Sequence, residues 1–256
     1  MIFLVGGNGL VGYAFQKYFK EHKIKYLNIQ RQNQNLFKGK KCDLLIYANG
    51  NANKTLAEKN PEYDFENTVS SIFFYLRNIK FKNFIFFSSV DVYRNTGKII
   101  GTSENNLEKN NSIYGINKIF SEIYVKKFCK KFLIFRLGGL VGDKLKKNPI
   151  YDIFNRNMLF TSINSEMNFI HTDFIPDLVF KLIKKSIKNS IFNLASKNSI
   201  SIKKILKNYK IKRIKKKKFN IQKYKINIKK ISTYVSLPRT EVSIERYIKK
   251  LNYEKK

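Results

Sequence analysis

A tyrosine and a lysine stand four residues apart in the middle of this chain, in Y-G-I-N-K, Tyr114 to Lys118. On a helix, positions i and i+4 lie about 40° apart around the axis, so both side chains would point the same way. An ammonium group beside a phenol stabilises the phenolate and lowers the tyrosine pKa from about 10 towards neutrality. Such a tyrosine can exchange a proton with an alcohol or ketone oxygen while a hydride moves at the carbon. In a chain with 51 basic residues, this spacing alone also fits an ordinary surface pair.

A glycine-rich turn near the first residues indicates where a cofactor could bind. The stretch V-G-G-N-G-L-V-G places Gly6, Gly9 and Gly12 in the spacing G-x-x-G-x-x-G, between an apolar run and a helical pattern. There the chain must bend sharply, a pyrophosphate must approach the backbone, and the helix N-terminus offers free N–H groups and a positive dipole end. The turn therefore predicts a dinucleotide site; a tight strand–helix turn without ligand is the alternative.

The end of the second strand bears on which dinucleotide binds. Gln30 stands near the position expected for an acid, and Arg31 follows it. An acid there would hydrogen-bond the adenosine ribose of NAD, whereas an arginine would pair with the 2′-phosphate of NADP. Arg31 favours NADP. NAD stays open, because Gln30 can hydrogen-bond a ribose and Arg31 can be a solvated loop cation.

The elements that must position these groups alternate between strand and helix over the first 140 residues. Continuously apolar strands separated by amphipathic helices predict a parallel sheet covered on both faces. The expected strands are 2–5, 26–30, 43–48, 83–88 and 132–136, and the expected helices are 10–22, 62–79 and 114–130. The fold class is therefore α/β, a Rossmann-type doubly wound parallel sheet.

After Gly142 the pattern loosens, and we expect a smaller C-terminal substrate-binding cap. The expected helices are 150–157, 173–187 and 241–251, and the expected strands are 168–171 and 191–195. We assign residues 1–142 to the dinucleotide-binding Rossmann domain, with 168–195 returning to it, and 143–167 and 196–256 to the cap.

The composition excludes several function classes. The net charge is +33, and residues 203–230 hold 14 basic side chains without an acid. Such a segment can attract nucleic acid or the diphosphate of a small ligand, or it can be a solvated surface in a lysine-biased chain. Arginine, with which nucleic-acid readers grip bases and phosphates, accounts for only 8 of the 51 basic residues, so we expect no nucleic-acid partner.

The hydropathy, the cysteines and the histidines bear on membrane association, disulfides and metal binding. No apolar stretch approaches the ~18 residues needed to span a bilayer, so we expect a cytoplasmic protein without a membrane partner. Cys42 and Cys129 lie in segments that read as core-facing, and we expect both to be reduced. His22 and His171 sit apart from other ligands, and no metal site is expected.

In their order, these motifs resemble the extended short-chain dehydrogenase/reductase superfamily, and within it the NAD(P)-dependent sugar-nucleotide epimerases, dehydratases and reductases. The similarity rests on the glycine turn, N-P-E-Y-D-F-E-N-T-V, F-I-F-F-S-S-V-D-V-Y, T-S-E-N, Y-G-I-N-K-I-F-S-E, L-I-F-R-L-G-G-L-V-G, F-I-H-T-D and S-I-F-N-L. These stretches cover nearly the whole chain.

The resemblance implies a role for each matching position. Ser89 would hydrogen-bond the reacting oxygen, Tyr114 would be the general acid/base, and Lys118 would bind the nicotinamide ribose while tuning the tyrosine. The implied cofactor-binding residues are Gly6, Asn8, Gly9, Leu10, Val11, Gly12, Arg31, Ala48, Asn49, Tyr114, Lys118, Leu137 and Gly138, and the implied substrate-binding residues are Val90, Asp91 and Gly139. The resemblance also implies a homodimer through the helices expected at 62–79 and 114–130.

Two departures from the family pattern narrow the reaction. Sugar-nucleotide 4,6-dehydratases carry an Asp-Glu pair after the catalytic Ser or Thr, and here those positions are Val90 and Asp91. Without the first acid, dehydration loses its proton donor. Asp91 can be a second acid/base or a carboxylate bonded to loop amides. In addition, only about a dozen residues join Gln30 to Asp43, too few for the helix–strand–helix usual in this branch.

We therefore expect an NADP-dependent reductase that acts on the C4 ketone of a nucleoside-diphosphate 4-keto (6-deoxy) sugar, with Tyr114 as proton donor. The basic C-terminal region would help to bind the substrate diphosphate. An NAD-dependent nucleotide-sugar 4-epimerase is the alternative. A non-catalytic cofactor-sensing or RNA-binding relative is a third hypothesis, against which the intact Ser89, Tyr114 and Lys118 speak.

Overall fold

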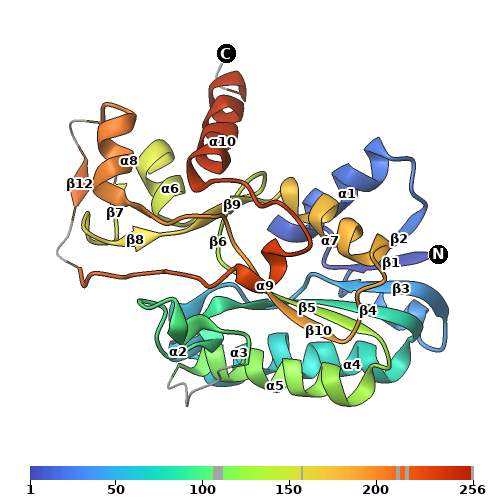
Figure 1. Cartoon of the computed structure of the whole chain (residues 1–256). Helices are drawn as coiled ribbons and strands as arrows, with labels where there is room; N and C mark the ends of the chain where they lie inside the picture. The colour runs from blue at the N-terminus through green and yellow to red at the C-terminus, as the bar shows by residue number, and fades with distance from the viewer. Residues whose placement is uncertain (106–111, 157, 212–213, 217–218, 255–256) are drawn as a thin grey trace.

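A six-stranded parallel sheet forms the centre of the molecule, with strand order β10-β5-β4-β3-β1-β2 (Figure 1). The computed structural model describes residues 1–105, 112–156, 158–211, 214–216 and 219–254. The strands are β1 (Ile2–Val5), β2 (Tyr26–Ile29), β3 (Lys41–Tyr47), β4 (Lys80–Ser89), β5 (Phe132–Leu137) and β10 (Ser190–Leu194). The predicted α/β fold class is confirmed.

Helices cover both faces of this sheet. One face carries α1 (Leu10–Glu21) and α7 (Phe174–Lys184), and the other carries α4 (Ser71–Asn78) and α5 (Ile113–Phe128) (Figure 1). The helix predicted over 62–79 is a run of α3 (Pro61–Phe65), the π-helical turn η2 (Glu66–Ser70) and α4, preceded by the short α2 (Lys54–Lys59).

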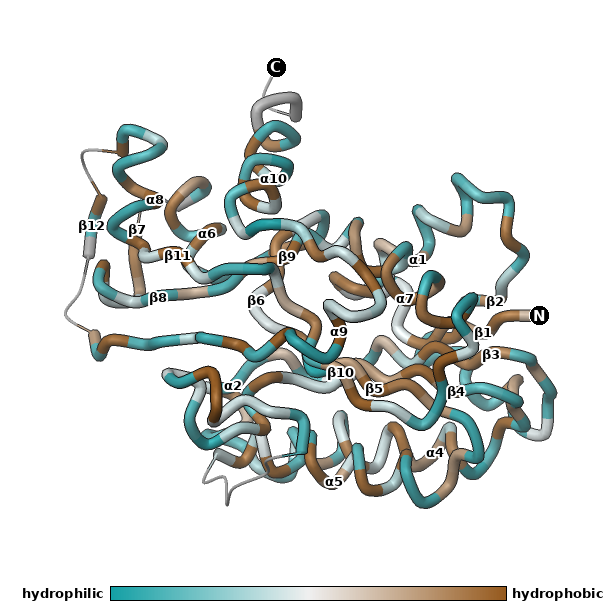
Figure 2. Tube along the Cα trace, viewed as in Figure 1, coloured by the Kyte–Doolittle hydropathy of each residue, from teal (hydrophilic) through white to brown (hydrophobic). Residues whose placement is uncertain are grey.

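The central strands carry apolar runs, Leu44–Tyr47 in β3 and Phe84–Phe87 in β4, because each face of the sheet has its own core. Ile46 and Phe87 pack with α1 and α7, whereas their chain neighbours Leu45 and Phe86 pack with α4 and α5. Successive side chains of a strand point to opposite faces, so burial on both sides requires an unbroken apolar run. Figure 2 shows these strands as the most hydrophobic part of the trace.

The connection between β2 and β3 is as short as the sequence predicts. It holds only the 3₁₀ turn η1 (Gln34–Phe37), and β3 pairs directly with β1. β2 is therefore an edge strand of the sheet, and the residues that follow it stand at that edge.

Small paired strands and short helices build the region after β5. β6 (Gly139–Val141) pairs with β9 (Phe169–His171), β7 (Met158–Leu159) with β12 (Lys215–Lys216), and β8 (Glu166–Met167) with β11 (Ile200–Ser201). α6 (Pro149–Tyr151) with the π-helical turn η5 (Asp152–Arg156), α8 (Ile202–Asn208) and α10 (Thr240–Glu254) pack around a separate apolar core. Asn157, the last residue of one predicted helix, lies outside the described residues, as do residues 212–213 and 217–218 of the lysine-rich segment.

Part of the expected cap returns to the Rossmann core. The short helix α9 (Lys229–Ser232) places Ile231 in the core beside α1 and α7, together with Val235 and Leu237. Ile226 packs with Val90 at the carboxyl end of β4. This segment therefore ties the cap to the end of the strand that carries Ser89.

The two cysteines and the two histidines have surroundings that fit a role in packing. Cys42 and Cys129 are buried and free, as predicted. His171 is buried beside Asp173, and His22 stacks on the ring of Tyr18. No group of three potential metal ligands occurs among the described residues. Within the same ranges, every helix is too short or too polar to cross a membrane.

Candidate active site

The predicted site residues converge on one edge of the parallel sheet. Gly6 follows β1, Ala48 follows β3, and Ser89 ends β4 directly opposite Leu137 at the end of β5. The carboxyl ends of neighbouring parallel strands meet at the same edge, where ligands of open α/β sheets bind. Gly139 lies one step further on, where β6 begins its pairing with β9.

The glycine turn is shaped as a cradle. Gly6 adopts a left-handed conformation with φ of 78°, and Gly9 N–H donates to the Gly6 carbonyl at 3.0 Å. A Cβ at Gly12 would stand 2.2 Å from that carbonyl oxygen, so only glycine lets α1 start this close to β1. No side chain caps α1, which begins at Leu10, and its first turn has no acid. Its N–H groups can therefore receive a pyrophosphate.

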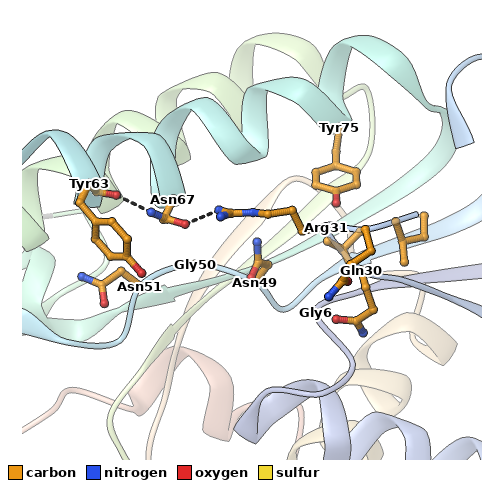
Figure 3. A pocket seen from close by; sticks show the side chains of 12 residues that line it. Gly6, Gln30, Arg31, Asn49, Gly50, Asn51, Tyr63, Asn67 and Tyr75 are labelled. Atoms are coloured by element: carbon orange, nitrogen blue, oxygen red, sulfur yellow. Dashed lines mark hydrogen bonds between the residues drawn. The ribbon is translucent and has the colours of Figure 1, made fainter. Parts of the chain in front are cut away.

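A cavity of about 290 Å³ lies beside this turn, at the ends of β1, β2 and β3 (Figure 3). Arg31 extends across it and donates to the side chain of Asn67, which itself donates to the Tyr63 carbonyl at 2.7 Å. Among the described residues that line the cavity, Arg31 is the one charged side chain and none is acidic. The lining residues are Val5, Gly6, Ile29, Gln30, Arg31, Gln32, Asn49, Gly50, Asn51, Tyr63, Asn67 and Tyr75.

Tyr114 lies in the first turn of α5, against the end of β4. The Ser112 hydroxyl caps this helix by accepting from Gly115 N–H at 3.1 Å, which fixes where the first turn begins. Tyr114 is 8% exposed, and its phenol lies close enough to Ser89 for the serine hydroxyl to influence its pKa. Lys118 Nζ lies 5.6 Å from the centre of the Tyr114 ring, so the predicted shared helix face is confirmed.

The predicted lowering of the Tyr114 pKa is wrong in this arrangement. Burial raises the pKa of Tyr114 because the phenolate would lose its hydration, and the Asp91 carboxylate adds to the rise. The charge that opposes this rise is that of Lys54, together with the Ser89 hydroxyl. Lys118 is not among the largest influences on the Tyr114 pKa.

Lys118 is itself strongly perturbed. It is 4% exposed, and burial lowers its pKa to about 8, against the opposing fields of Asp64 and Glu122. Its Nζ lies so close to Gly50 that a Cβ there would be 3.1 Å away. A buried ammonium of this kind is a strong donor aimed at the strand ends, where a ribose hydroxyl can accept it.

Asp91 has partners that the sequence did not indicate. Its backbone N–H donates to Ser89 Oγ at 3.1 Å, and Ser89 Oγ–H donates to Asp91 Oδ2 at 3.0 Å. Its other oxygen accepts from Lys54 Nζ at 2.6 Å and from the Tyr224 hydroxyl at 3.0 Å. Lys54 is one lysine among many in the chain, and Tyr224 is 133 residues from Asp91. No sequence motif therefore indicates that either residue contacts Asp91.

A buried polar network supports the strand ends behind this site. Arg136 donates to both carboxylate oxygens of Glu122, at 3.0 and 2.7 Å, and to the Tyr93 hydroxyl at 2.9 Å. Tyr93 donates to Asn193 at 2.7 Å, and Asn193 N–H donates to the Glu104 carboxylate at 3.0 Å. These five residues come from motifs quoted for the resemblance. Their role here is to hold β4, β5, α5 and β10 together.

Comparison with known proteins identifies the family. The model of the NAD dependent epimerase/dehydratase family matches residues 2–195, which is most of the chain. The chain belongs to this family. The family recognised from the sequence motifs is thereby confirmed.

Other members and structures are similar at low identity. This epimerase/dehydratase family member is 23% identical to an uncharacterized protein of Methanocaldococcus jannaschii over 221 residues, 80% of this chain and 67% of the relative. Its fold is similar to UDP-N-acetylglucosamine 4-epimerase from Methanobrevibacter ruminantium, with 14% identity, a TM-score of 0.80, and coverage of 99% of this chain and 98% of that one. It is also similar to dTDP-4-dehydrorhamnose reductase from Bacillus anthracis in complex with NADP, with 15% identity, a TM-score of 0.79 and coverage of 97% of each chain. These likenesses show a shared fold.

The residues of this family member fit the dinucleotide that the family name implies. The turn keeps its shape only with glycine at Gly6 and Gly12, because a Cβ at Gly6 would clash with the backbone of Ala48 and one at Gly12 with that of Gly6 itself. In this shape the backbone N–H groups at the start of α1 can receive a pyrophosphate. The adjoining cavity presents amide, hydroxyl and guanidinium groups to the rest of a nucleotide. The residues therefore fit a pyrophosphate at the turn and the rest of a nucleotide in the cavity beside it.

Proposed function

We propose that this protein is an NADP-dependent oxidoreductase that reduces the C4 ketone of a nucleoside-diphosphate 4-keto (6-deoxy) sugar. Arg31 carries the choice of cofactor, because it is the one charged side chain among the described residues that line the cavity beside the glycine turn. A guanidinium pairs with a phosphate dianion, whereas an NAD site of this fold usually offers a carboxylate to the ribose hydroxyls. The connection between β2 and β3 contains no further strand, so it offers no strand end that could carry a carboxylate for the ribose hydroxyls.

The nicotinamide, when bound, supplies the hydride that reaches C4. Tyr114 donates its phenolic proton to the nascent alkoxide, and Ser89 holds the same oxygen. The phenol of Tyr114 is protonated at neutral pH, which is the form that a proton donor requires. Lys118, whose ammonium lies 5.6 Å from the centre of the Tyr114 ring, would donate to the nicotinamide ribose hydroxyls. Ala48, Asn49, Leu137 and Gly138 would line the cofactor, and Asp91 and Gly139 would face the sugar, with Val90 beside them contributing its backbone rather than its buried side chain.

Val90 supports reduction over elimination. The side chain after Ser89 is a buried hydrocarbon that packs with Val92 and Ile226, so this position offers no proton to a leaving hydroxyl. A 4,6-dehydratase needs an acid there. The structural neighbours include both a 4-epimerase and a reductase, so the choice between these two reactions rests on Arg31.

We also propose that the protein forms a homodimer through α4 and α5. Phe73 and Phe120 are 37% and 45% exposed, and Ile123 and Phe128 are 51% and 38% exposed. All four lie on α4 and α5, and the rings of Phe73 and Phe128 are in contact across the two helices, with 5.6 Å between their centres. A second copy of the same pair of helices would bury them.

The test is mass spectrometry of the products formed from a panel of 4-keto sugar nucleotides with NADPH or NADH. We expect a product two mass units heavier, formed faster with NADPH, and none with Tyr114→Phe. Arg31→Ser should lower the preference for NADPH on the order of tenfold or more, while the exposed Lys25→Ser leaves it unchanged. Interconversion of two sugar nucleotides with bound NAD and no consumption of NADPH would refute the proposal in favour of a 4-epimerase.

A further inference from the structure

Asp91 has hydrogen-bond partners at both of its carboxylate oxygens. Those at Oδ1, Lys54 and Tyr224, have no role in the reaction proposed above. On its outer side, Lys54 Nζ donates to Oδ1 at 2.6 Å and to the Tyr224 hydroxyl at 2.8 Å, and Tyr224 donates to Oδ1 at 3.0 Å. The three side chains form a closed ring. They come from α2, from the turn after β4 and from the segment that follows β12.

On its inner side, Asp91 competes for the only proton of Ser89. A hydroxyl group has a single hydrogen to donate. In the structure Ser89 donates it to Asp91 Oδ2 at 3.0 Å. For the reaction proposed above, the same hydrogen must point to the oxygen at C4 of the substrate. Ser89 must therefore be able to exchange one acceptor for the other.

We propose that Lys54 and Tyr224 are positioning residues for Ser89: by holding Asp91 from its outer side, they let the Ser89 hydroxyl turn from the carboxylate to the substrate oxygen. This inference rests on the proposed function and deepens it. A carboxylate that already binds an ammonium and a phenol is a weaker acceptor at its other oxygen. It also keeps two partners when Ser89 leaves it.

The position of Tyr224 is fixed well enough for this role. Tyr224 N–H donates to the Glu166 carbonyl at 2.8 Å, and the next residue, Lys225, donates to the Thr96 carbonyl at 2.7 Å. The segment is thus bonded to the cap on one side and to the loop after β4 on the other. The Lys54 ammonium also lies 5.2 Å from the centre of the Tyr224 ring. Burial opposes the charge of Lys54, but Asp91 and Tyr224 raise its pKa, so the ammonium stays protonated.

The experiment compares the steady-state kinetics of the full-length protein with those of four variants. With NADPH and the 4-keto sugar nucleotide turned over by the wild type, Lys54→Met should lower kcat on the order of tenfold and leave KM within about twofold. Tyr224→Phe should lower kcat in the same direction by less. Lys54→Arg should restore most of kcat, because a guanidinium can donate to both Asp91 and Tyr224. Lys59→Met, an exposed lysine at the other end of α2, is the matched control and should behave as the wild type.

Three outcomes would overturn the inference. A raised KM with unchanged kcat in Lys54→Met would make Lys54 a substrate-binding cation. Equal loss in Lys54→Met and Lys54→Arg, with unfolding at lower urea in both, would make it a structural residue. Unchanged kinetics of folded Lys54→Met and Tyr224→Phe would remove any role in positioning. A wild type that reduces no sugar nucleotide would instead refute the proposed function and, with it, the inference that rests on it.

Discussion

Lys118→Met should stabilise the protein while it abolishes reduction. Lys118 is 4% exposed, and burial lowers its pKa from an ordinary 10.5 to about 8. Such a fall means that the folded state disfavours the charged form by about 3 kcal/mol near pH 7. Methionine has similar length and no charge, so we expect the free energy of unfolding to rise by about 1 to 3 kcal/mol, allowing for lost contacts of the ammonium.

The sign of the pH dependence makes this prediction specific. Below pH 8 Lys118 is protonated in both the folded and the unfolded protein, and the penalty is constant. Between the folded pKa of about 8 and the unfolded 10.5, the unfolded state binds the extra proton, so the stability of the wild type rises with pH. The advantage of Lys118→Met should therefore be largest near pH 7 and about 1 kcal/mol smaller near pH 9.

Urea unfolding followed by circular dichroism at the two pH values measures this difference. Lys126→Met, an exposed lysine on the same helix, is the control and should change stability by less than about 0.5 kcal/mol at either pH. A Lys118→Met variant that is less stable than the wild type at pH 7, or whose advantage does not shrink by pH 9, would show that the buried ammonium is not the source of the penalty.

Three further predictions concern the framework and the assembly. Glu122→Gln leaves the guanidinium of Arg136, which is fully buried, without its carboxylate and should destabilise the fold by about 3 to 5 kcal/mol in urea unfolding; a loss below about 1 kcal/mol would contradict this. Gly12→Ala should abolish NADPH binding in a fluorescence titration, because the new methyl group would lie 2.2 Å from the Gly6 carbonyl oxygen; an unchanged Kd would contradict the cradle. Ile123→Glu places a charge in the proposed dimer face and should halve the mass measured by light scattering, whereas a wild type that is already monomeric would refute the dimer.

Local patterns predicted the sheet and the tight glycine turn correctly. Leu45 and Ile46 belong to the run Leu44–Tyr47, which is apolar because it is buried on both faces of the sheet, and such a run can be recognised without knowledge of the rest of the fold. Gly12 must be glycine because it contacts Gly6, which is only six residues away. A contact between residues so close in the chain can be recognised as a sequence motif. The shared face of Tyr114 and Lys118 follows from helical geometry alone.

Burial reversed the prediction made for Tyr114. The Y-x-x-x-K spacing correctly places an ammonium near the phenol, but the sign of a pKa shift depends on every group around it. The walls that exclude water from Tyr114, and the carboxylate of Asp91 that adds to the rise, come from other segments of the chain. A spacing of four residues carries no information about them.

By itself, the sequence determined the fold class, the glycine turn, the short connection after β2 and the helix face shared by Tyr114 and Lys118, because each depends on residues within one or two neighbouring elements. Only the tertiary structure decided that Lys54 and Tyr224 close on Asp91, and that the Tyr114 pKa rises. Both results depend on contacts between segments up to 170 residues apart, as for Lys54 and Tyr224. Such contacts are set by how the cap packs on the sheet, and packing between distant segments leaves no periodic trace in the residues that make it.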